Sequence, residues 1–202
     1  VLGSGVGKSE GMPGLMASLA GSIPAPLVID ADGLSALAGR AGELESRTAP
    51  TLLTPHEGEA ARLLGIDSEE VAAHRLESAV RLAESSGAVV VLKGDDSIVT
   101  DGERIAVNDM PAPGLATAGT GDVLAGICGA FLGHGLDPFT AACAAVRIHT
   151  LAGSLAAEWL GSAEAMIASD VVESLPAALS SAAAHGGDGR AVFHDTVEES
   201  RR

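Results

Sequence analysis

The sequence has 202 residues, of which 47% are hydrophobic and 19% charged, and its formal net charge is −15 at pH 7. This length and apolar content fit one globular domain with a sizeable core. The acidic charge disfavours nucleic-acid binding, which needs clustered lysine and arginine, and the 2% aromatic content disfavours base-stacking surfaces. With no signal peptide or membrane span in the sequence pattern, we expect a cytoplasmic protein without nucleic-acid or membrane partners.

The chain opens with VLGSGVGKSE, which resembles the second half of a phosphate-binding P-loop. The complete P-loop pattern would require a glycine where this sequence has Leu2. Gly11 and Pro13 also disfavour a helix that starts directly at Ser9. We therefore interpret this segment as the end of a strand followed by a glycine turn and a later helix.

The following segments alternate short apolar runs with helical patterns, as in a parallel α/β sheet. In chain order the sequence predicts a strand at 26–30, a helix at 32–39, a strand at 51–54 and a helix at 57–65. Residues 67–87 then predict a single amphipathic helix capped by Asp67. Its expected apolar face consists of Val71, Leu76, Val80 and Leu82.

The second half of the chain starts with AVVVLKG at 88–94, which is the strongest strand signal. Residues 97–107 predict a hairpin that turns at Asp101-Gly102. Helices are predicted at 121–135, 138–160 and 168–184. Strands that alternate with helices predict an α/β fold with a mostly parallel sheet.

The predicted domain covers residues 1–180, and the composition becomes polar at 185–202, where we expect a disordered tail. Cys128 and Cys143 lie in predicted helices, where buried thiols in a reducing compartment are common. Their spacing indicates no metal site.

The segment AGTGDVLAG carries the sharpest chemical signal. Gly119 and Gly121 flank Thr120, and Asp122 follows at the start of a predicted helix. The amides at a helix N-terminus favour an anion, and glycine lets the anion come close. The pattern predicts an anion hole for a transferring phosphoryl group, with Asp122 as the base that accepts a hydroxyl proton. The alternative is that Asp122 only caps the helix.

Polar residues also follow three predicted strands, where open α/β sheets bind ligands. Lys93 and Gly94 end one strand and suit a phosphate contact, whereas Asp95 and Asp96 suit a solvated turn. After another strand, His56 suits a hydrogen bond to a polar substrate.

Structural roles account for the remaining polar positions or compete with a ligand role there. Glu57 and Glu59 suit the start of a helix, because its dipole favours negative charge. Asp30 and Asp32 suit either a substrate or a magnesium-bound water, or else a turn and a cap. His149, within a long helix, is expected to be a buried histidine with its hydrogen bonds satisfied.

Taken together, these segments resemble the nucleotide-dependent NAD(P)H-hydrate dehydratases, a family of ribokinase-like fold. The matching strings are GSGVG at the start, then VIDADGLSAL, LLTPHEGEAARLLG, VVLKG, PGLATAGTGDVLAGI and AVRIHTLAG. The resemblance implies a three-layer α/β/α sandwich. It also implies a repair reaction in which the (S) hydrate of NADH or NADPH is phosphorylated by ADP or ATP and then loses phosphate.

The resemblance also implies roles for individual residues. Asp122 is the base, and the amides of Gly119, Thr120 and Gly121 form the anion hole. The nucleotide-binding residues are Lys93, Gly94, Asp95, Asp96, Ser97 and Gly121. The residues that bind the hydrated dinucleotide are Gly7, His56 and Asp122. Magnesium accompanies the nucleotide phosphates, no protein metal ligand is implied, and a homo-oligomer is left open.

The sequence departs from the family pattern at several places. The family has a segment before this chain, with a glycine-rich substrate loop, so we expect an N-terminally incomplete sheet with an exposed edge. Ser97 replaces the usual threonine, and Ser35 a common asparagine. The loop 108–112 reads NDMPA where a glycine is usual, and its proline stiffens a loop beside the catalytic segment. Two alternatives stay open: a small-molecule kinase of the same fold, and a non-catalytic nucleotide-binding remnant.

Overall fold

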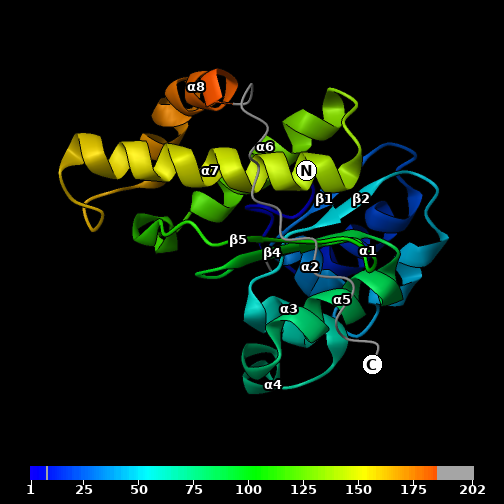
Figure 1. The fold of residues 1–202 in the computed structure, drawn as a ribbon. Helices are drawn as coiled ribbons and strands as arrows, with labels where there is room; N and C mark the ends of the chain where they lie inside the picture. Colours follow the sequence, from blue (N-terminus) through cyan, green and yellow to red (C-terminus); the bar gives the residue numbers. More distant parts are fainter. Residues whose placement is uncertain (8, 186–202) are drawn as a thin grey trace, which may run out of the picture.

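The structure is a computed structural model that describes residues 1–7 and 9–185 (Figure 1). In chain order its helices and strands are α1 (Met12–Ser22), β1 (Leu27–Ile29), α2 (Asp32–Ala36), β2 (Thr51–Leu53), α3 (Glu57–Leu64), α4 (Ser68–Ala73), α5 (Arg75–Ser86), β3 (Val89–Leu92), β4 (Ser97–Thr100), β5 (Ile105–Asn108), α6 (Thr120–Gly133), α7 (Pro138–Leu160) and α8 (Ala168–His185). Short 3₁₀ turns lie at Ala41–Ser46 and Pro113–Ala116. The polar tail expected at 185–202 lies outside the described residues, apart from the last residue of α8.

The strands form a five-stranded sheet in the order β1-β2-β3-β4-β5. β1, β2 and β3 pair in parallel, whereas β4 is antiparallel to both β3 and β5. In the described sheet β4 is therefore the one strand that runs against the others. Leu2 makes a single parallel bridge with Ile29 on the free side of β1. Leu2 thus pairs with the sheet edge as the predicted strand end would, although it lies outside the five named strands.

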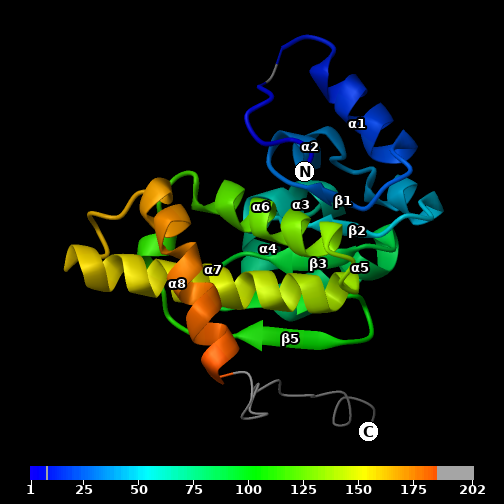
Figure 2. The ribbon, with the colours of Figure 1, turned by 90° about the horizontal axis from the view of Figure 1, so that it is seen from above.

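Helices cover both faces of the sheet, because successive strand residues point to opposite sides. On one face, Val28, Leu52 and Val91 pack with residues of α6, α7 and α8. On the other, Ile29, Leu53 and Val90 pack with residues of α2, α3, α4 and α5. The three layers are seen in Figure 1, and Figure 2 shows α6, α7 and α8 lying together over one face. The predicted three-layer α/β/α sandwich is confirmed.

Among the described residues, α7 is the helix long and apolar enough to cross a membrane by length and composition. However, 56% of its most apolar window is buried inside the protein. Its buried face consists largely of alanine, as at Ala141, Ala145 and Ala152, which lets it pack closely on the sheet. α7 is thus a core helix of the sandwich.

The single helix predicted for residues 67–87 is wrong. The helix is interrupted at His74, whose φ of −134° and ψ of 53° are not helical, and α5 begins at Arg75. Periodicity missed the break because the buried residues Val71, Ser78 and Leu82 keep helical spacing across it. Asp67 occupies the expected N-cap position, but its side chain makes no capping hydrogen bond.

The break also changes the buried face of this region. Leu76, expected in the apolar face, is exposed, and Val80 is only partly buried. The buried face of α5 consists of Ser78, Ala79, Leu82, Ala83 and Ser86.

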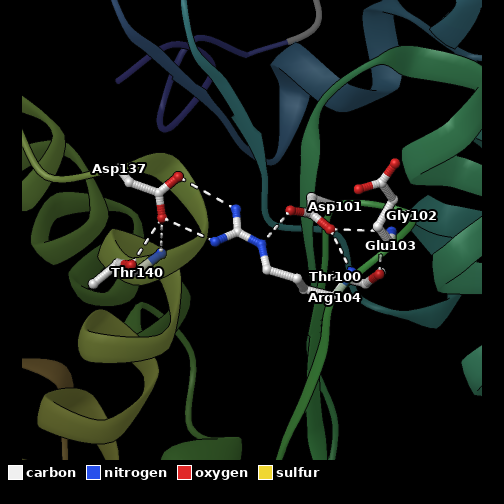
Figure 3. Close-up of polar contacts among 7 residues, drawn as sticks. All are labelled: Thr100, Asp101, Gly102, Glu103, Arg104, Asp137 and Thr140. Carbon is white, nitrogen blue, oxygen red and sulfur yellow. Dashed lines mark hydrogen bonds and ion pairs between the residues drawn. The ribbon is translucent and has the colours of Figure 1, made fainter. Parts of the chain in front are cut away.

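The predicted hairpin is confirmed, with a turn of residues 101–104 in place of a two-residue turn. Asp101 Oδ1 accepts hydrogen bonds from the backbone amides of Glu103 at 3.1 Å and Arg104 at 2.7 Å. Arg104 then reaches across to α7, where Nη2 lies 3.3 Å from Asp137 Oδ1 (Figure 3). Its guanidinium also lies 4.4 Å from the centre of the Phe139 ring. Arg104 therefore fastens the hairpin to the first turn of α7.

The contact between the hairpin and α7 can be tested at Asp137, the N-cap of α7. Its Oδ2 accepts from the Thr140 amide at 2.9 Å and from the Thr140 hydroxyl at 2.8 Å, and these bonds lower the pKa of Asp137. Asp137→Ala removes both the cap and the ion pair, and should lower the free energy of unfolding by about 1–2 kcal/mol in urea denaturation. Asp137→Asn keeps a capping oxygen and should cost only a few tenths of a kcal/mol. If Asp137→Ala and Asp137→Asn lost the same free energy of unfolding, the cap would contribute nothing and this prediction would be wrong.

Candidate functional site

Parallel strands β1, β2 and β3 end at one edge of the sheet, and their following residues meet there. Lys93, after β3, reaches Asp30, after β1, with Nζ 3.0 Å from Oδ1. Its Nζ also lies 3.8 Å from Glu59 Oε2 on α3. Asp30 is only 2% exposed, so Lys93 is the counter-ion of a buried carboxylate. The sequence placed Lys93 and Asp30 at the same edge but did not predict that they pair.

The first turn of α6 enters this edge. Gly119 is its N-cap with a φ of 88°, a value that suits glycine. The Thr120 hydroxyl donates to the carbonyls of Leu115 at 2.6 Å and Thr117 at 2.8 Å, and the Thr120 amide donates to Thr117 at 3.3 Å. The Thr120 amide is therefore already used within its own loop.

The next two amides of α6 are different. Gly121 and Asp122 lie in the first helical turn, where amides have no acceptor within the helix. In the part of the chain that the structure describes, no backbone acceptor is found for either amide. A methyl group built on Gly121 would lie 3.4 Å from Lys93 Nζ, so the lysine charge adjoins these free amides. Two amides, a helix dipole and an ammonium group thus favour an anion at this point.

Asp122 is the third residue of α6 and is exposed. The alternative role as a helix cap is wrong, since Gly119 is the N-cap and no side chain makes a capping hydrogen bond. Within residues 1–7 and 9–185, Asp122 forms no side-chain hydrogen bond or ion pair that would occupy its carboxylate. The carboxylate is therefore accessible to a ligand next to the free amides.

His56 follows β2 and is the N-cap of α3. Its Nδ1 accepts from the Gly58 amide at 3.0 Å, while its own amide donates to Glu59 Oε2 at 2.9 Å. This reciprocal pair is a capping box, in which the histidine takes the usual place of serine or threonine. One ring nitrogen of His56 is therefore committed to the backbone, and Nε2 lies 3.6 Å from Glu59 Oε1.

The glycine turn at the start of the chain is joined to the residues after β1. The Gly7 amide donates to Asp32 Oδ2 at 2.9 Å, so Asp32 holds this turn. A side chain at Gly3 would overlap the Asp30 carbonyl oxygen, so the close approach requires glycine. The turn and His56 thus lie at the ends of neighbouring strands. α1 begins at Met12, after the glycine turn, as the sequence predicted.

The loop 93–97 joins β3 to β4. The Lys93 amide donates to the Pro55 carbonyl at 2.8 Å, which ties the loop to the residues after β2. Asp95 and Asp96 are exposed, as expected for a solvated turn. Sequence reasoning missed the residue that holds the other side of this loop. This residue is Arg75, which pairs with Glu57 and donates to the Asp96 carbonyl at 2.8 Å.

His149 on α7 lies behind the first turn of α6. It is only 7% exposed, which confirms the expected burial. Its Nε2 is buried with no partner among the described residues, so the expectation that its hydrogen bonds are satisfied is wrong for this nitrogen. Burial lowers the pKa of His149 to about 4, and the positive charge of Lys93 acts in the same direction. A hydrogen bond with the Thr120 backbone opposes the shift. His149 is therefore a neutral buried group next to the loop that carries the free amides.

The low pKa of His149 predicts a loss of stability in acid. Its folded pKa of about 4 lies below the ordinary value of 6.5, so between these values the unfolded chain binds a proton that the folded chain does not. Stability should therefore fall as pH falls through this window, by about 2 kcal/mol at pH ~5 from this group. In urea titrations, His149→Gln should flatten this acid limb. His134→Gln, at an exposed histidine, is the control and should leave the limb as it is.

The sheet order and the two helical layers define a ribokinase-like α/β protein. A solved ribokinase-like superfamily protein from Enterococcus faecalis V583 superposes with a TM-score of 0.74 at 25% identity, over 89% of this chain and 62% of that one. Residues 1–177 match the sequence profile of the NAD(P)H-hydrate dehydratases. The chain belongs to this family.

Individual relatives agree with the family match. The bifunctional NAD(P)H-hydrate repair enzyme Nnr of Thermofilum pendens is 46% identical over 79% of this chain and 31% of its own length. The ADP-dependent (S)-NAD(P)H-hydrate dehydratase of Neisseria meningitidis is 38% identical over 85% of this chain and 59% of its own. The crystal structure of the ADP/ATP-dependent NAD(P)H-hydrate dehydratase from Bacillus subtilis, co-crystallised with ATP/Mg²⁺, superposes with a TM-score of 0.67 at 33% identity, over 77% and 55% of the two chains. This chain thus spans less than two thirds of the length of each of these proteins.

Proposed function

We propose that this protein dehydrates hydrated NADH or NADPH, of the (S) configuration, at the expense of ADP or ATP. The observation that carries the proposal is the start of α6, where two free amides adjoin Lys93 and the exposed carboxylate of Asp122. Such a site suits transfer of a phosphoryl group to a hydroxyl. Family membership and the names of the relatives support the hydrate as the acceptor and an adenine nucleotide as the donor.

In the proposed reaction, Asp122 accepts the proton of the hydrate hydroxyl while that oxygen attacks the terminal phosphorus of the nucleotide. The bond from phosphorus to the bridging oxygen breaks, and AMP or ADP leaves. The amides of Gly121 and Asp122 donate to the oxygens of the transferring group, where negative charge must be held. The phosphorylated ring then loses phosphate and a proton as its double bond re-forms, which restores NADH or NADPH.

A magnesium ion is part of this proposal through the nucleotide. Within the described residues, no group of three or more His, Cys, Asp and Glu side chains is arranged to hold a metal ion. We therefore propose that phosphate oxygens and water supply most of the magnesium ligands, which is the usual mode for this ion. When bound, magnesium would neutralise part of the phosphate charge. The protein would bind the nucleotide through the loop 93–97 and Gly121.

The hydrated dinucleotide is proposed to bind at Gly7, His56 and Asp122. The glycine turn is bonded to Asp32 after β1, and His56 follows the neighbouring parallel strand β2, so this common edge supports the proposal. The Nδ1 atom of His56 caps α3, so a substrate contact would use the Nε2 side of the ring.

His56 can be tested with two variants. His56→Ala loses the cap and should lower the free energy of unfolding by about 1 kcal/mol, in addition to weakening binding of the hydrate. His56→Asn keeps a capping acceptor, so its stability should be near wild type while its apparent affinity for hydrated NADH still falls. Thermal denaturation and steady-state kinetics separate the two effects. An unchanged affinity in both variants would remove His56 from the substrate site.

The direct test is recovery of NADH absorbance from its hydrate with ADP or ATP. A dehydratase restores the absorbance and releases free phosphate, whereas a small-molecule kinase accumulates a phosphorylated product. The assay is run on this chain and, where the reading frame continues upstream of Val1, on the longer product. Nucleotide binding without either product would identify a non-catalytic binding protein and overturn the proposal.

A cytoplasmic location belongs to the same proposal, whereas the homo-oligomer stays an open alternative. The structure has Cys128 and Cys143 as free thiols, which suits a reducing compartment. Burial raises the pKa of both thiols to about 12, so they stay protonated and unreactive. Sedimentation of the purified protein would measure the oligomeric state.

A further inference from the structure

Arg75 stands at the break between α4 and α5, beside the loop that joins β3 to β4. Its Nη2 donates to the Asp96 carbonyl at 2.8 Å, and its Nη1 pairs with Glu57 on α3. The side chain is 21% exposed, so most of it is packed against the protein. The backbone of His74 is not helical, and α5 starts at the next residue, Arg75. From this position the Arg75 side chain reaches the loop at Asp96. Arg75 thus ties α3, α5 and this loop together.

The loop also leaves room for this guanidinium. A side-chain Cβ atom built on Gly94 would overlap Nη2 of Arg75 and lie 2.7 Å from its Cζ. The guanidinium therefore packs directly against the Gly94 backbone. Gly94 does not have a positive φ, so its backbone would accept alanine, and the three atoms nearest to the added methyl group all belong to the Arg75 guanidinium.

The two sides of the loop are therefore held by different groups. The Lys93 amide is bonded to the Pro55 carbonyl at 2.8 Å, and the Asp96 carbonyl is bonded to Arg75. Between these two anchors the side chains of Asp95 and Asp96 are exposed. A guanidinium fork bonded to one carbonyl and one carboxylate is more rigid than a lysine would be. The loop backbone is thus hydrogen-bonded to other elements on both sides.

The charges around the loop 93–97 also favour a structural role for Arg75. The loop carries two aspartates and Glu57 lies nearby, which is unfavourable beside nucleotide phosphates unless the carboxylates are neutralised or turned outward. Arg75 neutralises Glu57 and, through the Asp96 carbonyl, holds the backbone while both aspartate side chains stay exposed. Without Arg75 the loop would lose this anchor, and Glu57 would lose its partner.

Resting on the proposed function, we propose that Arg75 is a positioning residue for the adenine nucleotide, which holds the loop 93–97 in its nucleotide-binding conformation. Arg75 acts through the loop backbone and need not touch the nucleotide. Binding free energy is then not spent on ordering the loop. Loss of Arg75 should therefore weaken nucleotide binding and leave the chemical step and the binding of the hydrate unchanged.

The test is calorimetric titration of this chain with ADP, which needs no turnover. Arg75→Met should weaken ADP binding on the order of 10-fold, as expected for loss of a charge-assisted hydrogen bond. Gly94→Ala should weaken it by a similar factor, because its methyl group displaces the guanidinium. The double variant should be no weaker than either single one, since both remove the same contact. Arg81→Met, at an exposed arginine of the same helix, is the control and should bind ADP as the wild type does.

Kinetics supply a measurement that general destabilisation would not reproduce. In Arg75→Met the KM for ADP should rise while kcat and the KM for the hydrate stay near wild type. Arg75→Lys keeps the positive charge but loses the two-pronged guanidinium. Its ADP affinity should lie between that of the wild type and that of Arg75→Met. Wild-type ADP affinity in Arg75→Met and Gly94→Ala, or additive effects in the double variant, would overturn the role of Arg75 alone. Failure of the wild-type chain to bind ADP would overturn the proposed function with it.

Discussion

Asp122→Asn is expected to lower kcat by about 10²–10⁴-fold, the usual contribution of a positioned general base. Asparagine has nearly the same shape but cannot accept the proton of the hydrate hydroxyl at neutral pH. The loss should appear in kcat, because the amides of Gly121 and Asp122 are backbone groups and remain in the variant. The measurement is recovery of NADH absorbance from the hydrate at saturating ADP.

Two further measurements separate the base from a structural role. The Asp122 side chain is exposed and does not cap α6, so Asp122→Asn should cost at most about 1 kcal/mol of stability, from the weaker helix-dipole interaction. ADP affinity should be largely unchanged. Glu103→Gln, at an exposed carboxylate on the hairpin turn, is the matched control and should keep full turnover. Near wild-type kcat in Asp122→Asn would remove Asp122 from the reaction.

The sheet and the long helices could be predicted because their signals are local. The strand residues Val89–Leu92 form an apolar run, and α7 matches the predicted range 138–160. α3 ends at Gly65 in the left-handed conformation that the glycine predicts. Each of these features depends on residues close together in the sequence. The common edge of three parallel strands followed from the same reasoning, which placed Asp30, His56 and Lys93 together.

The rest depends on contacts between distant residues. The break at His74 keeps the helical spacing of buried residues, and Arg75 meets its partners only after folding, so neither has a local signal. The Thr120 amide donates to the Thr117 carbonyl because the preceding 3₁₀ turn folds back on it, which removes Thr120 from the predicted set of anion-binding amides. The unpartnered nitrogen of His149 likewise depends on how α7 packs behind that turn. The sequence thus predicted which segments form the candidate site, while the hydrogen bonds of these segments required the structure.

Lys93 was expected to contact nucleotide phosphate, but its pairing with Asp30 predicts a large effect on stability as well. Lys93→Met leaves the 2%-exposed carboxylate of Asp30 without its counter-ion. Loss of one partner of a buried ion pair costs about 3–5 kcal/mol, so the free energy of unfolding should fall by this amount in urea denaturation. The cost arises from the carboxylate that remains, since the introduced methionine side chain would still cover much of the same apolar surface.

A second variant separates this structural role from phosphate binding. Adding Asp30→Leu to Lys93→Met removes both charges of this pair and should recover much of the lost stability, because the Asp30 carboxylate no longer stays buried without its counter-ion. The buried carboxylate of Glu59 also loses Lys93, but it keeps its hydrogen bond from the His56 amide. Its ADP affinity should nevertheless remain weak, since the ammonium group beside Gly121 is still missing. Recovery of both stability and ADP affinity in the double variant would show that Lys93 serves only as the counter-ion of Asp30. A Lys93→Met variant as stable as the wild type would instead contradict the buried ion pair itself.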